Sequence, residues 1–141
     1  MTVLSLTFLH YLAFSLGIGG GVAGLLAGRM AARAAPETRP ALGRLQRRVG
    51  QVSALSVLVL WVTGIWLVQE RYGGFASLSW LFWAKIAAVV ALTVCAAWLQ
   101  SLSFVAWRRG APPPATRMAL LSRLANLFAL VALALAVMAF A

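Results

Sequence analysis

Hydrophobic positions fall into four long runs, separated by short segments that carry most of the charge. Each run is longer than the ~20 apolar residues that a helix needs to cross a bilayer. The short segments hold the residues that break helices, namely Pro36, Pro40, Gly73, Gly74 and the prolines at 112–114. The pattern therefore predicts an all-α fold, an integral membrane four-helix bundle in a single domain. We expect its helices at about residues 3–28, 41–70, 77–107 and 116–141.

The composition supports a membrane protein and excludes a water-soluble domain. Hydrophobic residues make up 63% of the 141 residues, and charged residues only 10%. The net charge is +10, which in a soluble protein would suggest nucleic acid as a partner. Here the arginines flank apolar runs, so the expected partners are membrane lipids with anionic headgroups. We expect no nucleic acid to bind.

The arginines are distributed unevenly among the three connections. The first connection and its flanking turns hold six of them, at positions 29, 33, 39, 44, 47 and 48. The third holds Arg108, Arg109 and Arg117, whereas the second holds only Arg71. The positive-inside rule places the first and third connections in the cytoplasm. Both chain termini are then expected on the outer (periplasmic) side of a bacterial inner (plasma) membrane.

The first apolar run contains the only histidine, His10. An imidazole inside such a run is costly unless it faces protein, a cofactor or water, so His10 is a candidate site residue. At helical spacing His10 shares one face with Phe14, Gly17 and Gly21, and this bare face could admit a flat cofactor. The same glycines also suit close packing of helices, within the chain or between copies in a homo-oligomer. Both interpretations stay open, although packing does not require an imidazole.

Lys85 is the second candidate, because it is the only lysine among the 12 basic residues and lies in an apolar run. Its long stem could carry the ammonium to the outer headgroups or to Glu70. Alternatively, burial could keep the amine neutral, so that it binds a metal or moves protons. As a cation, Lys85 could pair with a propionate of a bound porphyrin. The predicted topology places His10 and Lys85 in the same outer half of the membrane.

The histidine suggests a metal site of one kind in particular. His10 is a possible axial ligand of haem iron. Because the chain has one histidine, two histidines cannot ligate iron within a monomer. Ligation by His10 with Lys85, by His10 with a methionine, or by His10 from each of two copies remains open. The sequence has no carboxylate pair, no Cys/His spacing for zinc and no phosphate-binding loop.

Four short segments share residues with one known family. They are Leu9-His10, Gln46-Arg47-Arg48-Val49 leading to Leu60-Trp61-Val62-Thr63-Gly64, Trp83-Ala84-Lys85-Ile86, and Arg123-Leu124-Ala125-Asn126. On these segments the chain resembles the HemJ-type protoporphyrinogen IX oxidases, which are related more distantly to the CopD-like copper-resistance proteins. The resemblance implies haem b as cofactor, a porphyrin substrate that loses hydrogen, and electrons passed onward, for example to quinone.

The resemblance also implies site residues and has clear departures. His10 and Lys85 would be catalytic, and Arg123 and Asn126 would join them in binding the cofactor. The family's histidines near the end of the third helix are replaced here by Cys95-Ala96-Ala97-Trp98, and the acid after the asparagine by Leu127. The proline common in the family's second helix is missing. The fold and a haem site at His10 therefore carry over more directly than the oxidase activity.

The predicted function is thus a b-type haem-binding membrane protein, acting in porphyrin oxidation or membrane electron transfer. Two alternatives remain. One is a non-enzymatic accessory or assembly subunit of a larger membrane complex, with the glycine face against a partner helix. The other is a CopD-like transport module. Whether the protein is an enzyme stays open at this point.

Overall fold

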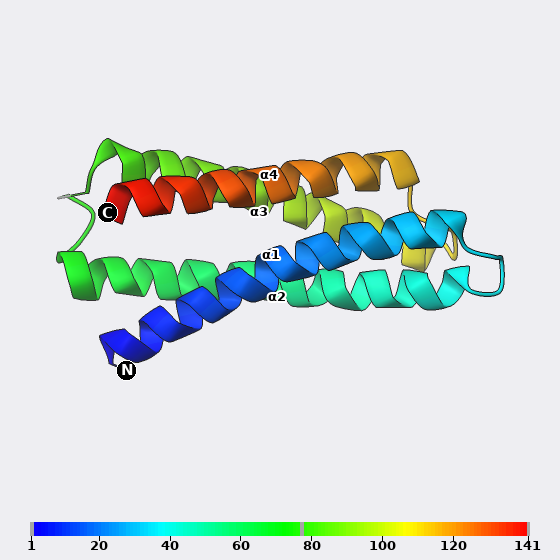
Figure 1. Ribbon diagram of the computed structural model, residues 1–141, viewed down its shortest axis with the longest axis horizontal. Helices are drawn as coiled ribbons and strands as arrows, with labels where there is room; N and C mark the ends of the chain where they lie inside the picture. Colours follow the sequence, from blue (N-terminus) through cyan, green and yellow to red (C-terminus); the bar gives the residue numbers. More distant parts are fainter. Residues whose placement is uncertain (1, 77, 141) are drawn as a thin grey trace.

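The computed structural model describes residues 2–76 and 78–140, which form four helices and no strand (Figure 1). These are α1 (Val3–Arg33), α2 (Arg39–Tyr72), α3 (Trp80–Arg108) and α4 (Ala115–Phe140). Each helix is long and apolar enough to cross a membrane. The predicted all-α fold with four membrane-length helices is therefore confirmed, as is the multi-pass character of the chain.

The first and second helices are longer than predicted. α1 continues to Arg33 instead of ending near residue 28, because alanine and arginine favour helix beyond the apolar run. It is followed by Ala34, whose backbone is extended with φ −76° and ψ 155°, and Pro36 disfavours helix at the residue before it. α2 begins at Arg39 with Pro40 in its first turn. It ends at Tyr72 and is capped by Gly73, whose φ of 67° is the left-handed conformation that glycine adopts readily.

The third helix starts later than the predicted residue 77, which lies outside the described residues. Ser79 has extended backbone, with φ −67° and ψ 162°, and Trp80 is the first helical residue. The carbonyl of Ser79 then accepts from Phe82 N at 3.0 Å, which closes the first turn. The fourth helix starts at Ala115, and its predicted last residue, 141, lies outside the described residues.

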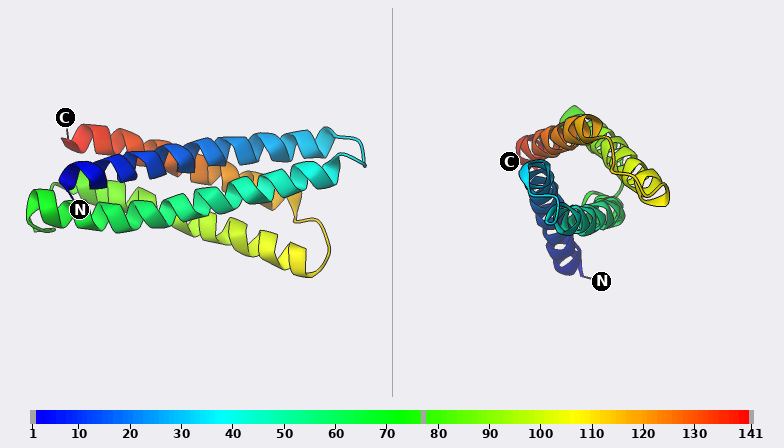
Figure 2. Two further views of the ribbon diagram at one scale, coloured as in Figure 1. Left: turned by 90° about the horizontal axis from the view of Figure 1, so that it is seen from below. Right: turned by 90° about the vertical axis from the view of Figure 1, so that its right-hand side faces the viewer.

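The helices form two antiparallel hairpins, α1–α2 and α3–α4. Within each hairpin the helices pack along their length, whereas the two hairpins contact each other over fewer residues. The N-terminal part of α1 leans away from the rest of the bundle (Figure 2). Both termini and the α2–α3 connection lie at one end of the molecule, and the two arginine-rich connections lie at the other (Figures 1 and 2).

Mostly small side chains form the interior of the described part of the bundle, together with Leu6 and Phe82, and many large apolar side chains cover its outside. Six of the buried residues are alanines: Ala13, Ala27, Ala88, Ala106, Ala129 and Ala132. Leu4 and Trp80, by contrast, are 80% and 74% exposed. Lipid tails are as apolar as leucine, so apolar side chains gain little by leaving the lipid, and small residues let the helix backbones approach. The arrangement is the one expected for helices that face lipid.

Three glycines of α1 lie directly beneath polar side chains of neighbouring helices. A Cβ on Gly20 would meet the Ser53 hydroxyl of α2. A Cβ on Gly21 would lie 2.5 Å from Asn126 Oδ1 of α4, and one on Gly28 would lie 2.7 Å from Gln46 Nε2 of α2. The packing interpretation therefore accounts for these three positions. Gly19 and Gly24 differ, because a Cβ there would meet nothing within 4 Å.

The placement of both arginine-rich connections at one end leads to a test of orientation. We expect reporter fusions after Arg39 and after Pro113 to read as cytoplasmic, because positively charged loops are retained on that side. A fusion in the turn at 72–74 is expected to read as external. Alkaline phosphatase and green fluorescent protein fusions measure the two outcomes. The reverse pattern would place His10 in the inner half of the membrane.

Candidate functional site

His10 makes one hydrogen bond across the α1–α2 interface. Its Nδ1 lies 2.8 Å from Thr63 Oγ1, and Thr63 is only 4% exposed. The Thr63 hydroxyl also donates to the carbonyl of Val59 at 2.7 Å, one turn earlier in α2. A hydroxyl has a single proton to donate. Thr63 therefore accepts from His10, so the imidazole carries its proton on Nδ1 and has its lone pair on Nε2.

Gly64 provides the space that the imidazole occupies. A Cβ at this position would lie 3.2 Å from Cε1 of His10, which is tighter than an ordinary contact. The ring thus packs against the backbone of α2 while Thr63 holds its Nδ1. No described residue hydrogen-bonds to Nε2, which is therefore available to a ligand. Thr63 and Gly64 together position a half-buried histidine with one nitrogen in use.

Lys85 lies on α3, in the other hairpin, close enough to His10 for the two side chains to interact electrostatically. Its Nζ is 5.6 Å from the ring centroid of Phe82, one turn earlier, in a cation–π contact. Glu70, the acid considered as a partner for Lys85, accepts from Trp66 Nε1 at 3.2 Å. The structure therefore brings His10 and Lys85 into one region, where Thr63 contacts His10.

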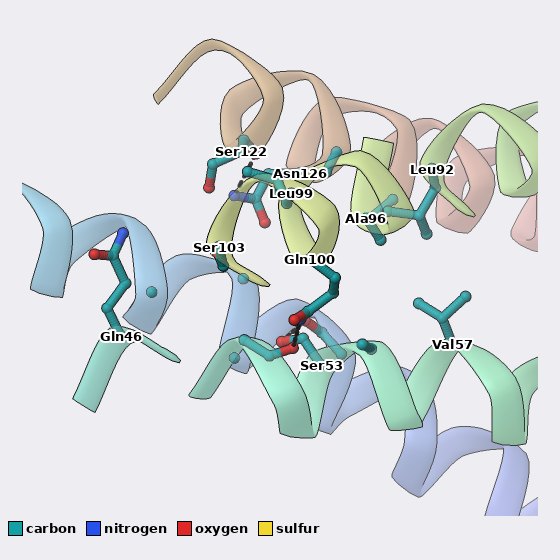
Figure 3. A pocket seen from close by; sticks show the side chains of 18 of the residues that line it. Gln46, Ser53, Val57, Leu92, Ala96, Leu99, Gln100, Ser103, Ser122 and Asn126 are labelled. Atoms are coloured by element: carbon teal, nitrogen blue, oxygen red, sulfur yellow. Dashed lines mark hydrogen bonds between the residues drawn. The ribbon is translucent and has the colours of Figure 1, made fainter. Parts of the chain in front are cut away.

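A cavity of about 220 Å³ lies between the two hairpins, toward the arginine-rich end (Figure 3). Four of the residues predicted to bind a cofactor line this cavity: Phe14, Gly17, Gly21 and Asn126. His10, Lys85 and Arg123 are not among its lining residues, and Arg123 is exposed on α4. Phe14 is one helical turn from His10, so the cavity ends one turn short of the histidine. The predicted set thus divides between two places in the bundle.

Polar side chains in the cavity wall tie the helices together. Gln100 of α3 donates to the carbonyl of Gly50 in α2 at 2.6 Å, and Ser53 of α2 donates to the carbonyl of Gly17 in α1 at 3.3 Å. Asn126 Nδ2 donates to the carbonyl of Ser122 at 3.0 Å, which fixes the amide so that Oδ1 faces Gly21.

Ser53 and Gln100 were not predicted as site residues, and Gln46 was noted only within the segment that resembles the HemJ-type family. Gln46 and Ser53 are seven residues apart in α2, in a segment that also holds Arg47, Arg48 and Gln51, and Gln100 precedes Ser101 in α3. Two turns of helix put Gln46 and Ser53 on the same face of α2, and this spacing is the sequence signal that could have identified them. The pattern marks an inward face of α2 but does not identify its partners, since those lie on other helices.

No three His, Cys, Asp or Glu side chains among the described residues lie together in a way that could hold a bare metal ion. Searches against protein-family models, curated proteins and solved structures find no match. The resemblance to HemJ-type oxidases thus rests on the four short segments alone.

The single histidine makes the tautomer directly measurable. In protein labelled with ¹⁵N-histidine and free of bound metal, we expect one set of ring signals showing the Nδ1–H form, because the Thr63 proton is committed to Val59. Thr63→Val is expected to convert this into a mixture of tautomers. Thr93→Val is the matched control, since Thr93 likewise donates to a carbonyl in its own helix, at 2.7 Å, but accepts from Trp61. A wild-type spectrum dominated by Nε2–H would contradict the assignment.

Proposed function

We propose that this protein binds haem b within the membrane and that His10 ligates the iron through Nε2. The observation that carries the proposal is the hydrogen bond from Nδ1 to Thr63, at 2.8 Å. Histidines that ligate metals usually donate their other ring N–H to a fixed acceptor, which sets the tautomer and the ring orientation. Thr63 supplies that acceptor, and Gly64 leaves room for the ring.

The donor set favours a porphyrin over a bare metal ion. A bare ion takes several ligands from the protein, and the described residues bring no three suitable side chains together. A porphyrin supplies its own ring nitrogens, so a single axial histidine from the protein is sufficient. This supports haem as the cofactor in a chain whose only histidine is His10.

The space near His10 limits how a porphyrin can bind. The cavity of about 220 Å³ is below the ~300–1,000 Å³ typical of ligand pockets, and it ends one turn short of His10. A porphyrin therefore does not fit between the hairpins as they are packed. The interface between the hairpins is the less extensive one. Binding thus requires the hairpins to part near His10 and Lys85, or a second copy of the chain to complete the site.

In this proposal the residues have separate roles. A bound haem would supply a one-electron Fe(III)/Fe(II) couple. Thr63 orients the imidazole, and Lys85, from the opposite hairpin, places a positive charge near the site that can pair with a propionate. The protein then acts in membrane electron transfer or in porphyrin oxidation, with a porphyrin substrate and quinone as partners, in a bacterial inner membrane.

A second candidate is a CopD-like transport module or an accessory subunit without redox chemistry. It is favoured by one observation, namely that the cavity is separate from His10 and Lys85. The visible absorption spectrum of the purified protein distinguishes the two candidates. A Soret band that shifts on reduction supports the haem protein, whereas a colourless protein from a haem-replete host supports the second candidate.

The ligand assignment predicts the behaviour of His10→Ala. We expect this variant to insert and fold but to lose its Soret band, because the change removes a polar group from an apolar helix together with the axial ligand. Thr63→Val is expected to weaken haem retention by ~10–100-fold, the usual effect of losing the partner of a ligating histidine. Thr93→Val serves as the control and should retain haem. A normal spectrum in His10→Ala would exclude His10 as the ligand.

The role of Lys85 is tested by two substitutions. If the ammonium pairs with a propionate, Lys85→Arg keeps the positive charge and retains haem with a shifted redox potential, while Lys85→Met loses haem affinity. If the neutral amine binds iron, the order is reversed, because a guanidinium stays charged and a thioether can coordinate iron. Spectra and potentiometric titration measure both outcomes. Wild-type behaviour in both variants would show that Lys85 has no part in the site.

A further inference from the structure

The cavity between the hairpins has a polar end and an apolar end. Figure 3 shows Gln46, Ser103 and Ser122 toward one end, and Val57 and Leu92 toward the other. Its lining also includes Arg47, in the third turn of α2 and at the arginine-rich end of that helix. The lining of the cavity thus becomes less polar from the charged surface toward the middle of the membrane. A ligand that is polar at one end and apolar at the other would fit this cavity.

The polar groups at that end are available to a ligand. No described residue hydrogen-bonds to the Gln46 amide or to the Ser103 and Ser122 hydroxyls. The Arg47 guanidinium lies 4.8 Å from the ring centroid of Trp107, which holds the positive charge beside the cavity. Amide and hydroxyl donors beside a cation form a receptor for an anionic, hydrogen-bond-accepting headgroup.

The shape of the cavity limits the rest of the ligand. On α2 its lining runs from Gly43 to Leu60, about 25 Å of helix at 1.5 Å per residue. A volume of about 220 Å³ over that length makes the cavity narrow. A bilayer core of ~30 Å is two acyl chains thick, so one chain of ~15 Å occupies the apolar part of the cavity and leaves the polar end for its headgroup. The width does not suit the paired chains of a phospholipid.

From these features we propose that the cavity binds a single-chain amphiphile with an anionic headgroup, of the fatty-acid class. The headgroup lies among Gln46, Arg47, Ser103 and Ser122, and the chain extends past Gly24 toward Val57 and Leu92. This site is independent of the proposed haem at His10, which does not line the cavity.

Two pairs of variants test the site. Gly24 and Gly19 both lie on α1, and a Cβ on either meets nothing within 4 Å, but only Gly24 lines the cavity. Gly24→Leu therefore fills the cavity, and Gly19→Leu is its matched control. Arg47 lines the cavity, whereas Arg44, one turn earlier in α2, does not. Arg47→Gln with Arg44→Gln as its control therefore tests the headgroup.

The experiment is photo-crosslinking with palmitic acid that carries a mid-chain diazirine, in nanodiscs of neutral phosphatidylcholine. Peptide mass spectrometry is expected to locate the crosslinks on cavity-lining segments of α1 and α3. Gly24→Leu should reduce them by about tenfold, because leucine takes the space of the chain, and Gly19→Leu should not. Unlabelled palmitate should compete, while its methyl ester and inorganic phosphate should not. His10→Ala should label normally, which separates this site from the haem proposal.

Three results would overturn the proposal. Equal labelling of Gly24→Leu and Gly19→Leu would mean that the probe contacts only the lipid-facing surface. Competition by the methyl ester as effective as that by palmitate, or an unchanged affinity in Arg47→Gln, would exclude an anionic headgroup. Competition by inorganic phosphate alone would show a site for a free anion instead of an amphiphile.

Discussion

The bundle depends on the close approach of helix backbones that carry small side chains. In lipid, apolar side chains gain little by moving from the acyl chains into the protein. The helices are therefore held by van der Waals contact and by hydrogen bonds between them. Gly20, Gly21 and Gly28 on α1 let Ser53, Asn126 and Gln46 reach its backbone, and Gly64 on α2 does the same for His10. These four polar side chains each lie against a glycine of the neighbouring helix.

This constraint explains which parts of the protein could be predicted. The four helices follow from the four apolar runs, because any segment in lipid must satisfy its own backbone hydrogen bonds. The exact ends of the helices were less predictable, since they depend on local backbone conformation. Ser79 has extended backbone before α3, and the alanines before Arg33 continue α1 beyond the membrane-length run. Neither feature changes the apolar pattern on which the prediction was based.

The candidate site was predictable in its residues but not in its contacts. His10 and Lys85 stand out because ionisable side chains are rare in apolar runs. The partner of His10, however, lies 53 residues away in the sequence, and the pairing depends on how α1 and α2 are aligned. The same reason explains the cavity. Phe14 and Gly17 share a face with His10 by helical spacing, yet they line a cavity that His10 does not reach.

The division into two hairpins has a consequence for how the protein is made. Contacts are extensive within α1–α2 and within α3–α4 and sparse between them, so each hairpin can complete most of its packing as it leaves the translocation machinery. Only two described side-chain hydrogen bonds, Gln100 to Gly50 and Trp61 to Thr93, join α2 to α3. This distribution of contacts favours an assembly in which the two halves associate late. The connection at 73–79 serves mainly as a tether, and the two halves, made as separate polypeptides, would retain the information needed to find each other.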